Sequence, residues 1–96
     1  MKYVIIKNKV YGVEPSLRLN KKYDVILFNP DKTKKFITSF GDKRYQQYYD
    51  YFGHYKNLNH NDKERRKRYR LRHKNDIGVV NDDPNYAGYW SWYYLW

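Results

Sequence analysis

The sequence predicts an α+β fold, with a small antiparallel sheet in the first half of the chain and helices in the second half. Residues 2–7 and 21–40 are rich in β-branched and aromatic side chains, and the second stretch alternates as a half-buried hairpin does. After residue 41 the hydrophobic period changes, and Asp or Asn residues precede helical stretches as N-caps. A chain of 96 residues without a low-complexity linker is expected to form one domain, residues 1–96.

The first strand is expected over residues 2–7, which read KYVIIK. Gly12 and Pro15 interrupt the residues that follow, and both are common in turns. Residues 11–20 are therefore expected to form a loop.

The clearest local feature is a hairpin. Residues 21–28 (KKYDVILF) form the first strand, residues 29–32 (NPDK) supply turn chemistry, and residues 33–40 return. The alternation places on one face of each strand Tyr23, Val25 and Leu27 and then Phe36, Thr38 and Phe40.

A helix is expected from about Lys43 to Gly53, with Asp42 as its N-cap. Its aromatic residues recur at i, i+3, i+4 and i+7, which predicts one stripe packed in the core. The stripe consists of Tyr45, Tyr48, Tyr49 and Phe52. Exposed tyrosines could instead stack on single-stranded bases, but packing is the ordinary meaning of this spacing.

A second helix is expected over residues 61–74, with Asn61 as N-cap and Glu64 at the capping-box position. The C-terminal segment 86–96 fits either a helix or a strand. Asp83 as N-cap and Pro84 at the first helical position favour a short helix there. The sheet is thus expected to be followed by two helices and an aromatic C-terminal segment.

Composition restricts what stabilises this fold. Aromatic residues make up 21% of the chain, 13 of them tyrosine, and there is no cysteine. Disulfides and thiolate metal sites are excluded, so the fold depends on packing. Because a buried tyrosine hydroxyl needs a partner or solvent, the core is expected to be shallow and partly wet, or to be completed by another molecule.

The net charge of +10 is concentrated in one segment. Residues 63–74 carry eight Lys or Arg and one Glu, whereas residues 75–96 carry three Asp and no Lys or Arg. Such a domain typically meets phosphate, an acidic protein or an anionic surface. No apolar run approaches the ~20 residues of a membrane span, and no signal peptide is recognised. The chain is therefore expected to be soluble, in a reducing compartment, and without a membrane partner.

Seven bases of the second helix are candidate nucleic-acid-binding residues: Lys63, Arg65, Arg66, Lys67, Arg68, Arg70 and Arg72. Arg would bind phosphate as a fork and Lys as a point charge. A solvated helix usually mixes charge signs at i,i+4, and the like charges here favour a polyanionic partner. Alternatively, the aromatic tail folds back, and at least two of these Arg stack on Trp90, Trp92 or Tyr93.

The aromatic tail has two interpretations of its own. Trp and Tyr are enriched in interface hot spots, so Trp90, Trp92 and Trp96 are candidate partner-binding residues. The same residues could instead close the core of the domain.

His60, Asp62 and His73 offer ligand atoms but no shared metal site. His60 and Asp62 flank a helix start without facing each other, and His73 lies ~16 Å further along the axis. His60 is expected to cap or pack there, and His73 to interact with the helix dipole. We predict that the protein is not an enzyme and that it has no catalytic residue, bound metal, cofactor or small-molecule substrate. A small nuclease using His60 and Asp62 remains a third hypothesis, and it would need a nearby acidic cluster.

Several motifs over residues 20–96 together resemble an uncharacterised family of small basic proteins of nucleocytoplasmic large DNA viruses. They read KKYxV, FGDxxYxxYxD, HxDxxRRxxYxxRH and SxxYLW. The matching residues are Lys21, Lys22, Tyr23 and Val25; Phe40, Gly41, Asp42, Tyr45, Tyr48 and Asp50; His60, Asp62, Arg65, Arg66, Tyr69, Arg72 and His73; and Ser91, Tyr94, Leu95 and Trp96. Residues 1–13 and the segment between His73 and Pro84 depart from the pattern. The resemblance implies a viral protein carried in the particle, and no activity.

Together these features predict a non-enzymatic, virion-associated protein that binds the nucleic-acid phosphate backbone, of double-stranded DNA in the first instance, without strong sequence preference. During infection it would be found in the host cytoplasm, at the viral factory, or in the nucleus. The alternative is a minor capsid or scaffold protein, whose basic helix binds acidic virion proteins and whose aromatic terminus docks into one of them.

Overall fold

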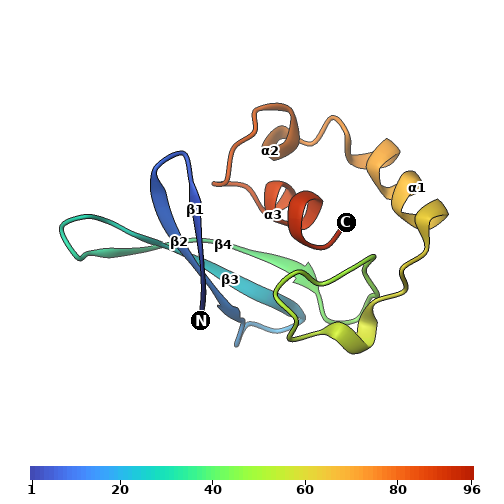
Figure 1. Ribbon diagram of the computed structural model, residues 1–96, viewed down its shortest axis with the longest axis horizontal. Coiled ribbons are helices and arrows are strands. Elements are labelled where there is room, and N and C mark those ends of the chain that lie inside the picture. The colour runs from blue at the N-terminus through green and yellow to red at the C-terminus, as the bar shows by residue number, and fades with distance from the viewer.

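A computed structural model describes residues 1–96, and it has the expected α+β fold (Figure 1). The four strands form one antiparallel sheet in the order β1-β2-β3-β4. The strands are β1 (Lys2–Ile6), β2 (Lys9–Pro15), β3 (Lys21–Phe28) and β4 (Lys34–Asp42). Three α-helices follow: α1 (Lys63–His73), α2 (Ile77–Val80) and α3 (Ala87–Tyr94). None of the helices is long and apolar enough to cross a membrane.

Strand β2 (Lys9–Pro15) occupies the first half of the segment expected to be a loop, so the loop prediction is wrong for residues 11–15. Lys7 and Asn8 both have positive φ, at 52° and 66°, as a two-residue hairpin turn of type I′ requires. Gly12 lies within the strand, and the residue there is glycine because a Cβ would overlap the side chains of Met1 and Phe28. Its presence reflects this close packing and not a turn.

The β3–β4 hairpin is confirmed, with one correction on β4. The pairing with β3 skips Ile37, which is the extra residue of a β-bulge. Phe36 therefore lies opposite Ile26, and its side chain is exposed while Phe40 is buried. The expectation that Phe36 shares a face with Thr38 and Phe40 is wrong, because the bulge reverses the alternation.

The helix expected from Lys43 to Gly53 is absent, and that prediction is wrong. Residues 43–55 form an irregular segment, which we call the 43–55 segment, and a short 3₁₀ turn, η1 (Lys56–Leu58), follows it. Several of its backbone N–H groups donate to acceptors far away in the sequence. Tyr48 and Tyr49 both donate to the carbonyl of Leu95 at 3.1 Å, and Tyr51 donates to the carbonyl of Tyr94 at 3.0 Å.

The side chain of Asp50 holds the same segment from the inside. Asp50 is fully buried and accepts hydrogen bonds from the N–H groups of Phe52 (2.9 Å) and Tyr55 (2.8 Å) and from the hydroxyl of Tyr23 (2.5 Å). These bonds compete with a helical ladder. Of the predicted aromatic stripe, only Phe52 is fully buried.

Helix α1 confirms the expected basic helix, one residue out of register at its start. The N-cap is Asp62, not Asn61, because the Asp62 carboxylate accepts from the N–H groups of Glu64 and Arg65 at 2.9 and 3.2 Å. Asn61 has a positive φ of 55° and precedes the cap. The capping box predicted around Asn61 therefore does not form.

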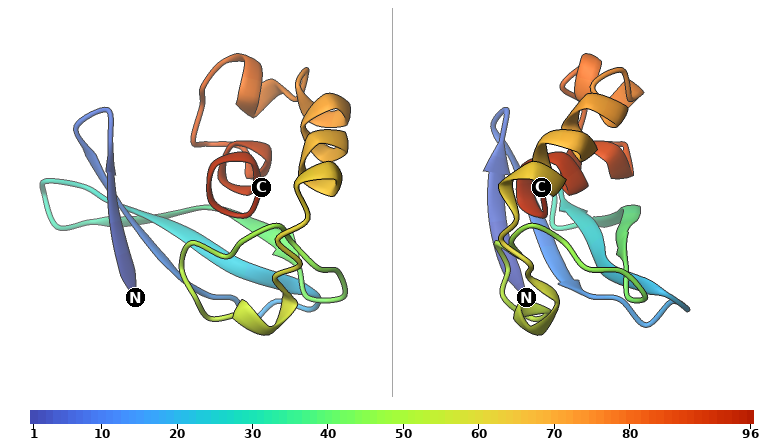
Figure 2. Two further views of the ribbon diagram at one scale, coloured as in Figure 1. Left: turned by 45° about the vertical axis from the view of Figure 1, so that its right-hand side comes forward. Right: turned by 90° about the vertical axis from the view of Figure 1, so that its right-hand side faces the viewer.

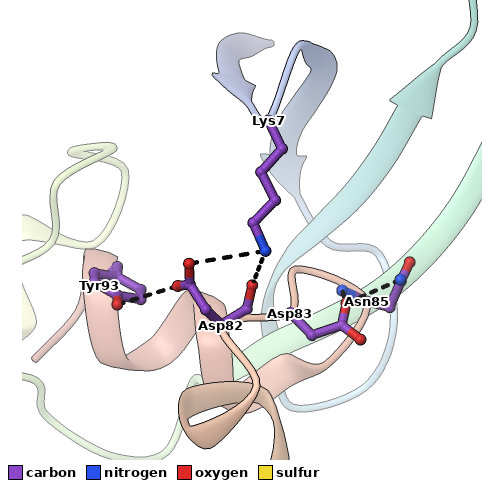
Figure 3. A network of polar contacts seen from close by, with 5 residues as sticks. All are labelled: Lys7, Asp82, Asp83, Asn85 and Tyr93. Atoms are coloured by element: carbon purple, nitrogen blue, oxygen red, sulfur yellow. Dashed lines mark hydrogen bonds and ion pairs between the residues drawn. The ribbon is translucent and has the colours of Figure 1, made fainter.

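The tail is helical, as favoured, but α3 begins later than Asp83 and Pro84 suggest. Its N-cap is Tyr86, which makes no side-chain cap bond. Asp83 instead accepts from the backbone and side chain of Asn85, both at 2.9 Å. Figure 3 shows the neighbouring contacts, in which Lys7 of the β1–β2 turn binds Asp82, and Asp82 accepts from Tyr93 at 3.3 Å.

Helix α3 packs on the sheet beside β4, and α1 lies on the outer side of α3, away from the sheet (Figure 2). Trp90 of α3 is completely buried at the centre of the core. Its ring stacks on Phe40 at 5.9 Å and meets Tyr11 edge-on at 5.5 Å, and its Nε1–H donates to the carbonyl of Pro84 at 2.7 Å. The prediction that Trp90 binds a partner is therefore wrong, because no part of its ring is accessible.

Candidate nucleic-acid interface

Helix α1 has an outer and an inner face, although no residue of it is buried. The inner residues are half-buried and point toward α3 and the 43–62 segment; they are Arg65, Arg66, Tyr69, Arg70 and His73. The outer residues are exposed and mostly basic; they are Lys63, Glu64, Lys67, Arg68, Leu71 and Arg72, with Lys74 just beyond the helix.

Arg66 and Arg70 hold α1 against the tail. Both donate from Nε to the carbonyl of Trp96, at 2.7 and 3.3 Å. The guanidinium of Arg66 lies over the ring of Tyr48 at 4.9 Å, and that of Arg70 lies over Trp92 at 4.6 Å. The expectation that at least two Arg stack on Trp90, Trp92 or Tyr93 is met by Arg70 alone, because the ring under Arg66 is Tyr48, which is not part of the tail.

Trp96 also joins α1 to the tail. Its ring stacks on Tyr69 at 4.3 Å with an interplanar angle of 5°, and its other neighbour is the ring of His60 at 5.2 Å. Burial raises the pKa of Tyr69 to about 12. Trp92 and Trp96 are therefore partly used inside the domain, and their remaining surface is what a partner could reach.

The predicted binding residues divide between two sides of α1. On one side lies a shallow groove of about 530 Å³, lined by Lys63, Arg66, Lys67, Arg70, Leu71 and Lys74. On the other side Arg65 and Arg72 border a pocket of about 660 Å³ that reaches β4 and α3. Arg65 donates there to Gln46 at 2.8 Å. Arg68 is exposed on the outer face.

The charge of α1 is not neutralised within the domain. The structure contains two ion pairs, Lys7–Asp82 and Arg44–Asp42, and neither involves α1. Glu64 is the single acid among residues 63–74. The groove on α1 has no acidic residue in its lining. The helix thus presents a cationic surface that can receive an anion.

The histidines have local structural contacts. His60 accepts the N–H of Asp62 at Nδ1 (2.9 Å) and lies between the rings of Tyr48 and Trp96. Burial, followed by the nearby charge of Arg65, lowers the pKa of His60. His73 packs on Tyr69 at 4.3 Å. No three His, Asp or Glu side chains group as a metal site would require.

A buried polar cluster was not predicted. The Nζ of Lys22, which is almost completely buried, donates to the carbonyl of Tyr45 (2.9 Å) and to Oε1 of Gln47 (2.5 Å). Burial lowers the pKa of Lys22 to about 8, and the charge of Asp50 partly opposes that shift. The sequence gives no signal for this burial, since Lys22 stands beside Lys21 in an ordinary basic pair. The cluster supports the 43–55 segment on which Arg66 rests.

Comparison with models of protein families, with curated proteins and with solved structures finds no match for this chain.

Proposed function

We propose that the protein is non-enzymatic and binds the phosphate backbone of nucleic acid through the exposed bases of α1, without strong sequence preference. The observation that carries the proposal is the unpaired charge: eight Lys or Arg within residues 63–74, none of them in an ion pair. Exposed like charges spaced i,i+4, such as Lys63 and Lys67 or Arg68 and Arg72, destabilise an isolated helix. A polyanion removes that repulsion and releases its own counterions on binding.

The internal roles of Arg66 and Arg70 refine the working set. These two are anchored to the tail and carry part of the field, whereas the freely exposed bases are placed to reach phosphates. The proposed contact residues are therefore led by Lys63, Lys67, Arg68 and Arg72, with Lys74. Arg65 is half-buried and bonded to Gln46, which makes it secondary.

The resemblance to a viral family described above supports a viral setting for this function. We propose that the protein belongs to a large DNA virus and is carried in its particle. It would meet nucleic acid in the viral factory of the cytoplasm or in the nucleus.

Fluorescence anisotropy with a labelled random-sequence duplex, at several salt concentrations, tests the binding. Engagement of four or five phosphates predicts a slope of log affinity against log salt of about −3.6 to −4.5. The triple variant Lys63→Ala, Lys67→Ala, Arg68→Ala should bind more weakly, with a slope shallower by about 2–3. A matched control removes the same charge from the sheet, at the exposed Lys2, Lys9 and Lys35.

The control should keep the wild-type slope if α1 is the contact surface. Equal losses in the two triple variants would mean that net charge alone governs binding, and would refute a specific role for α1. Duplexes of different defined sequences should bind with nearly the same affinity, because the phosphate backbone is common to all of them.

A minor capsid or scaffold role is the second candidate, and one observation favours it. Leu71 is 58% exposed in the middle of the basic groove, and an apolar centre with a charged rim is typical of protein interfaces. Absence of binding to nucleic acid near physiological salt, together with capture of an acidic virion protein that Leu71→Asp abolishes, would support this second candidate.

A further inference from the structure

Three tyrosines are exposed together next to the basic groove. Tyr49, Tyr51 and Tyr93 have 51%, 65% and 51% of their surface in solvent. They border one hollow of about 160 Å³ with Arg66, Arg70 and Trp96. We call these three side chains the tyrosine surface. It combines residues of the 43–55 segment with a residue of α3, which are far apart in the sequence.

The tyrosine surface is continuous with the basic groove of α1. Arg66 and Arg70 border both the hollow beneath the tyrosines and the groove that contains Lys63, Lys67 and Lys74. A ligand that lies along the groove would therefore reach the tyrosines within the same binding event. Such a ligand needs anionic groups on one side and flat apolar groups on the other.

Two of the three rings, those of Tyr51 and Tyr93, are held in place before any ligand binds. Tyr51 meets Phe52 edge-on at 5.5 Å and Tyr94 at 5.3 Å, and its N–H is bonded to the carbonyl of Tyr94. Tyr93 packs on Tyr89 at 4.8 Å. Fixed rings lose little conformational entropy when a planar group stacks on them.

From this juxtaposition we infer that the preferred ligand is single-stranded nucleic acid, with its phosphates along the α1 groove and unpaired bases stacked on Tyr49, Tyr51 and Tyr93. The inference rests on the proposed phosphate binding and specifies its substrate. Exposed aromatics beside a cationic groove are the usual combination in proteins that bind single strands. A duplex presents the same phosphates, but its bases are already stacked on each other and cannot reach the tyrosines.

The experiment compares a labelled 12-nucleotide oligo-dT with a random-sequence duplex of equal length, at one fixed salt concentration. Wild type should prefer the single strand. Tyr51→Ala and Tyr93→Ala should each weaken oligo-dT binding about five- to a hundredfold and leave duplex binding within about twofold. Tyr51→Phe should keep the wild-type affinity, because stacking needs the ring and not the hydroxyl.

Tyr3→Ala is the matched control. Tyr3 is 63% exposed and meets Phe28 edge-on at 5.5 Å, so it has the exposure and ring contact of Tyr51 but lies on β1. It should leave both affinities unchanged. Circular dichroism melting of each variant shows that the fold is kept, and Tyr51→Phe and Tyr93→Ala remain informative should Tyr51→Ala unfold.

The outcomes separate the two proposals. Duplex binding that depends on α1 but is unaffected by the tyrosines, with no preference for the single strand, would overturn this inference and leave phosphate binding standing. Absence of binding to either probe would overturn both and favour a protein partner at this surface. Loss of oligo-dT binding in the tyrosine variants alone would confirm the inference.

Discussion

Removal of the buried carboxylate of Asp50 should destabilise the domain severely. Asp50 satisfies three donors at once, the hydroxyl of Tyr23 and the N–H groups of Phe52 and Tyr55. A buried donor left without an acceptor costs about 1–3 kcal/mol. Three such donors would cost up to about 9 kcal/mol, but removing the carboxylate also removes the cost of its own desolvation. We therefore expect Asp50→Ala to lower the free energy of unfolding by about 3–6 kcal/mol. Small domains have about 5–15 kcal/mol in total, so this variant should be largely unfolded or close to it.

Asp50→Asn gives a finer measurement of the same effect. The amide keeps one acceptor oxygen but places an NH₂ group against donors that the second carboxylate oxygen had accepted. The expected loss is about 2–3 kcal/mol. Urea unfolding followed by tryptophan fluorescence is a suitable assay, because Trp90 stacks on Phe40 in the same core.

Asp31→Asn is the control for this experiment. Asp31 also accepts an N–H and a hydroxyl, both from Thr33, but in an exposed turn. The loss of stability in Asp31→Asn should be much smaller than in Asp50→Asn, since water replaces the lost acceptor. If Asp50→Asn changed the free energy of unfolding no more than Asp31→Asn does, the carboxylate would not organise the 43–55 segment, and that reasoning would be wrong.

Three further predictions concern stability. Burial lowers the pKa of Lys22 to about 8, whereas the pKa of an unfolded lysine is near 10.4. Between these pH values the unfolded chain binds more protons than the folded chain, so the folded state gains stability as the pH rises. From pH 8 to 10 the free energy of unfolding of wild type, measured in urea, should rise by on the order of 2 kcal/mol relative to that of Lys22→Met. Gly88→Ala should cost about 1–3 kcal/mol, because its Cβ would overlap the carboxylate of Asp76, which caps α2; a melting temperature equal to that of wild type would contradict this. Trp96→Ala removes the ring stacked on Tyr69 and should speed amide exchange in α1 more than in β3, whereas uniform exchange would mean that the stack does not dock the helix.

Local patterns predicted β1, the β3–β4 hairpin and the basic helix, but they missed β2, because Gly12 and Pro15 are typical of turns. The alternation around Tyr23 and Val25 was enough to place β3, and the charge density of residues 63–74 was enough to identify the basic helix. The 43–55 segment was predicted wrongly because its tyrosines happen to fall at helical spacing. Its conformation is decided by two kinds of acceptor that hydrophobic periodicity does not reveal: the buried carboxylate of Asp50 within the segment, and the carbonyl of Leu95, which is far away in the sequence.

The same distinction holds for the candidate site. The sequence alone showed that α1 would carry much of the positive charge, because eight Lys or Arg fall within residues 63–74. Which arginines are anchored depended on where residues 92–96 pack, so Arg66 and Arg70 could not be told from Lys67 or Arg68 beforehand. The tyrosine surface could not be predicted from the sequence, because the helix expected over residues 43–53 placed Tyr49 in the core.

The most direct test of the account is a nitrogen-15 NMR titration of the intact chain with a short oligonucleotide at moderate salt. The largest amide shifts should map to α1, from Lys63 to Lys74, with smaller shifts at residues 48–51 and 93, while β1 and the β3–β4 turn stay unchanged. Shifts centred on the sheet would contradict the assignment of α1 as a nucleic-acid surface. The absence of any shift with the oligonucleotide in large excess would contradict it as well.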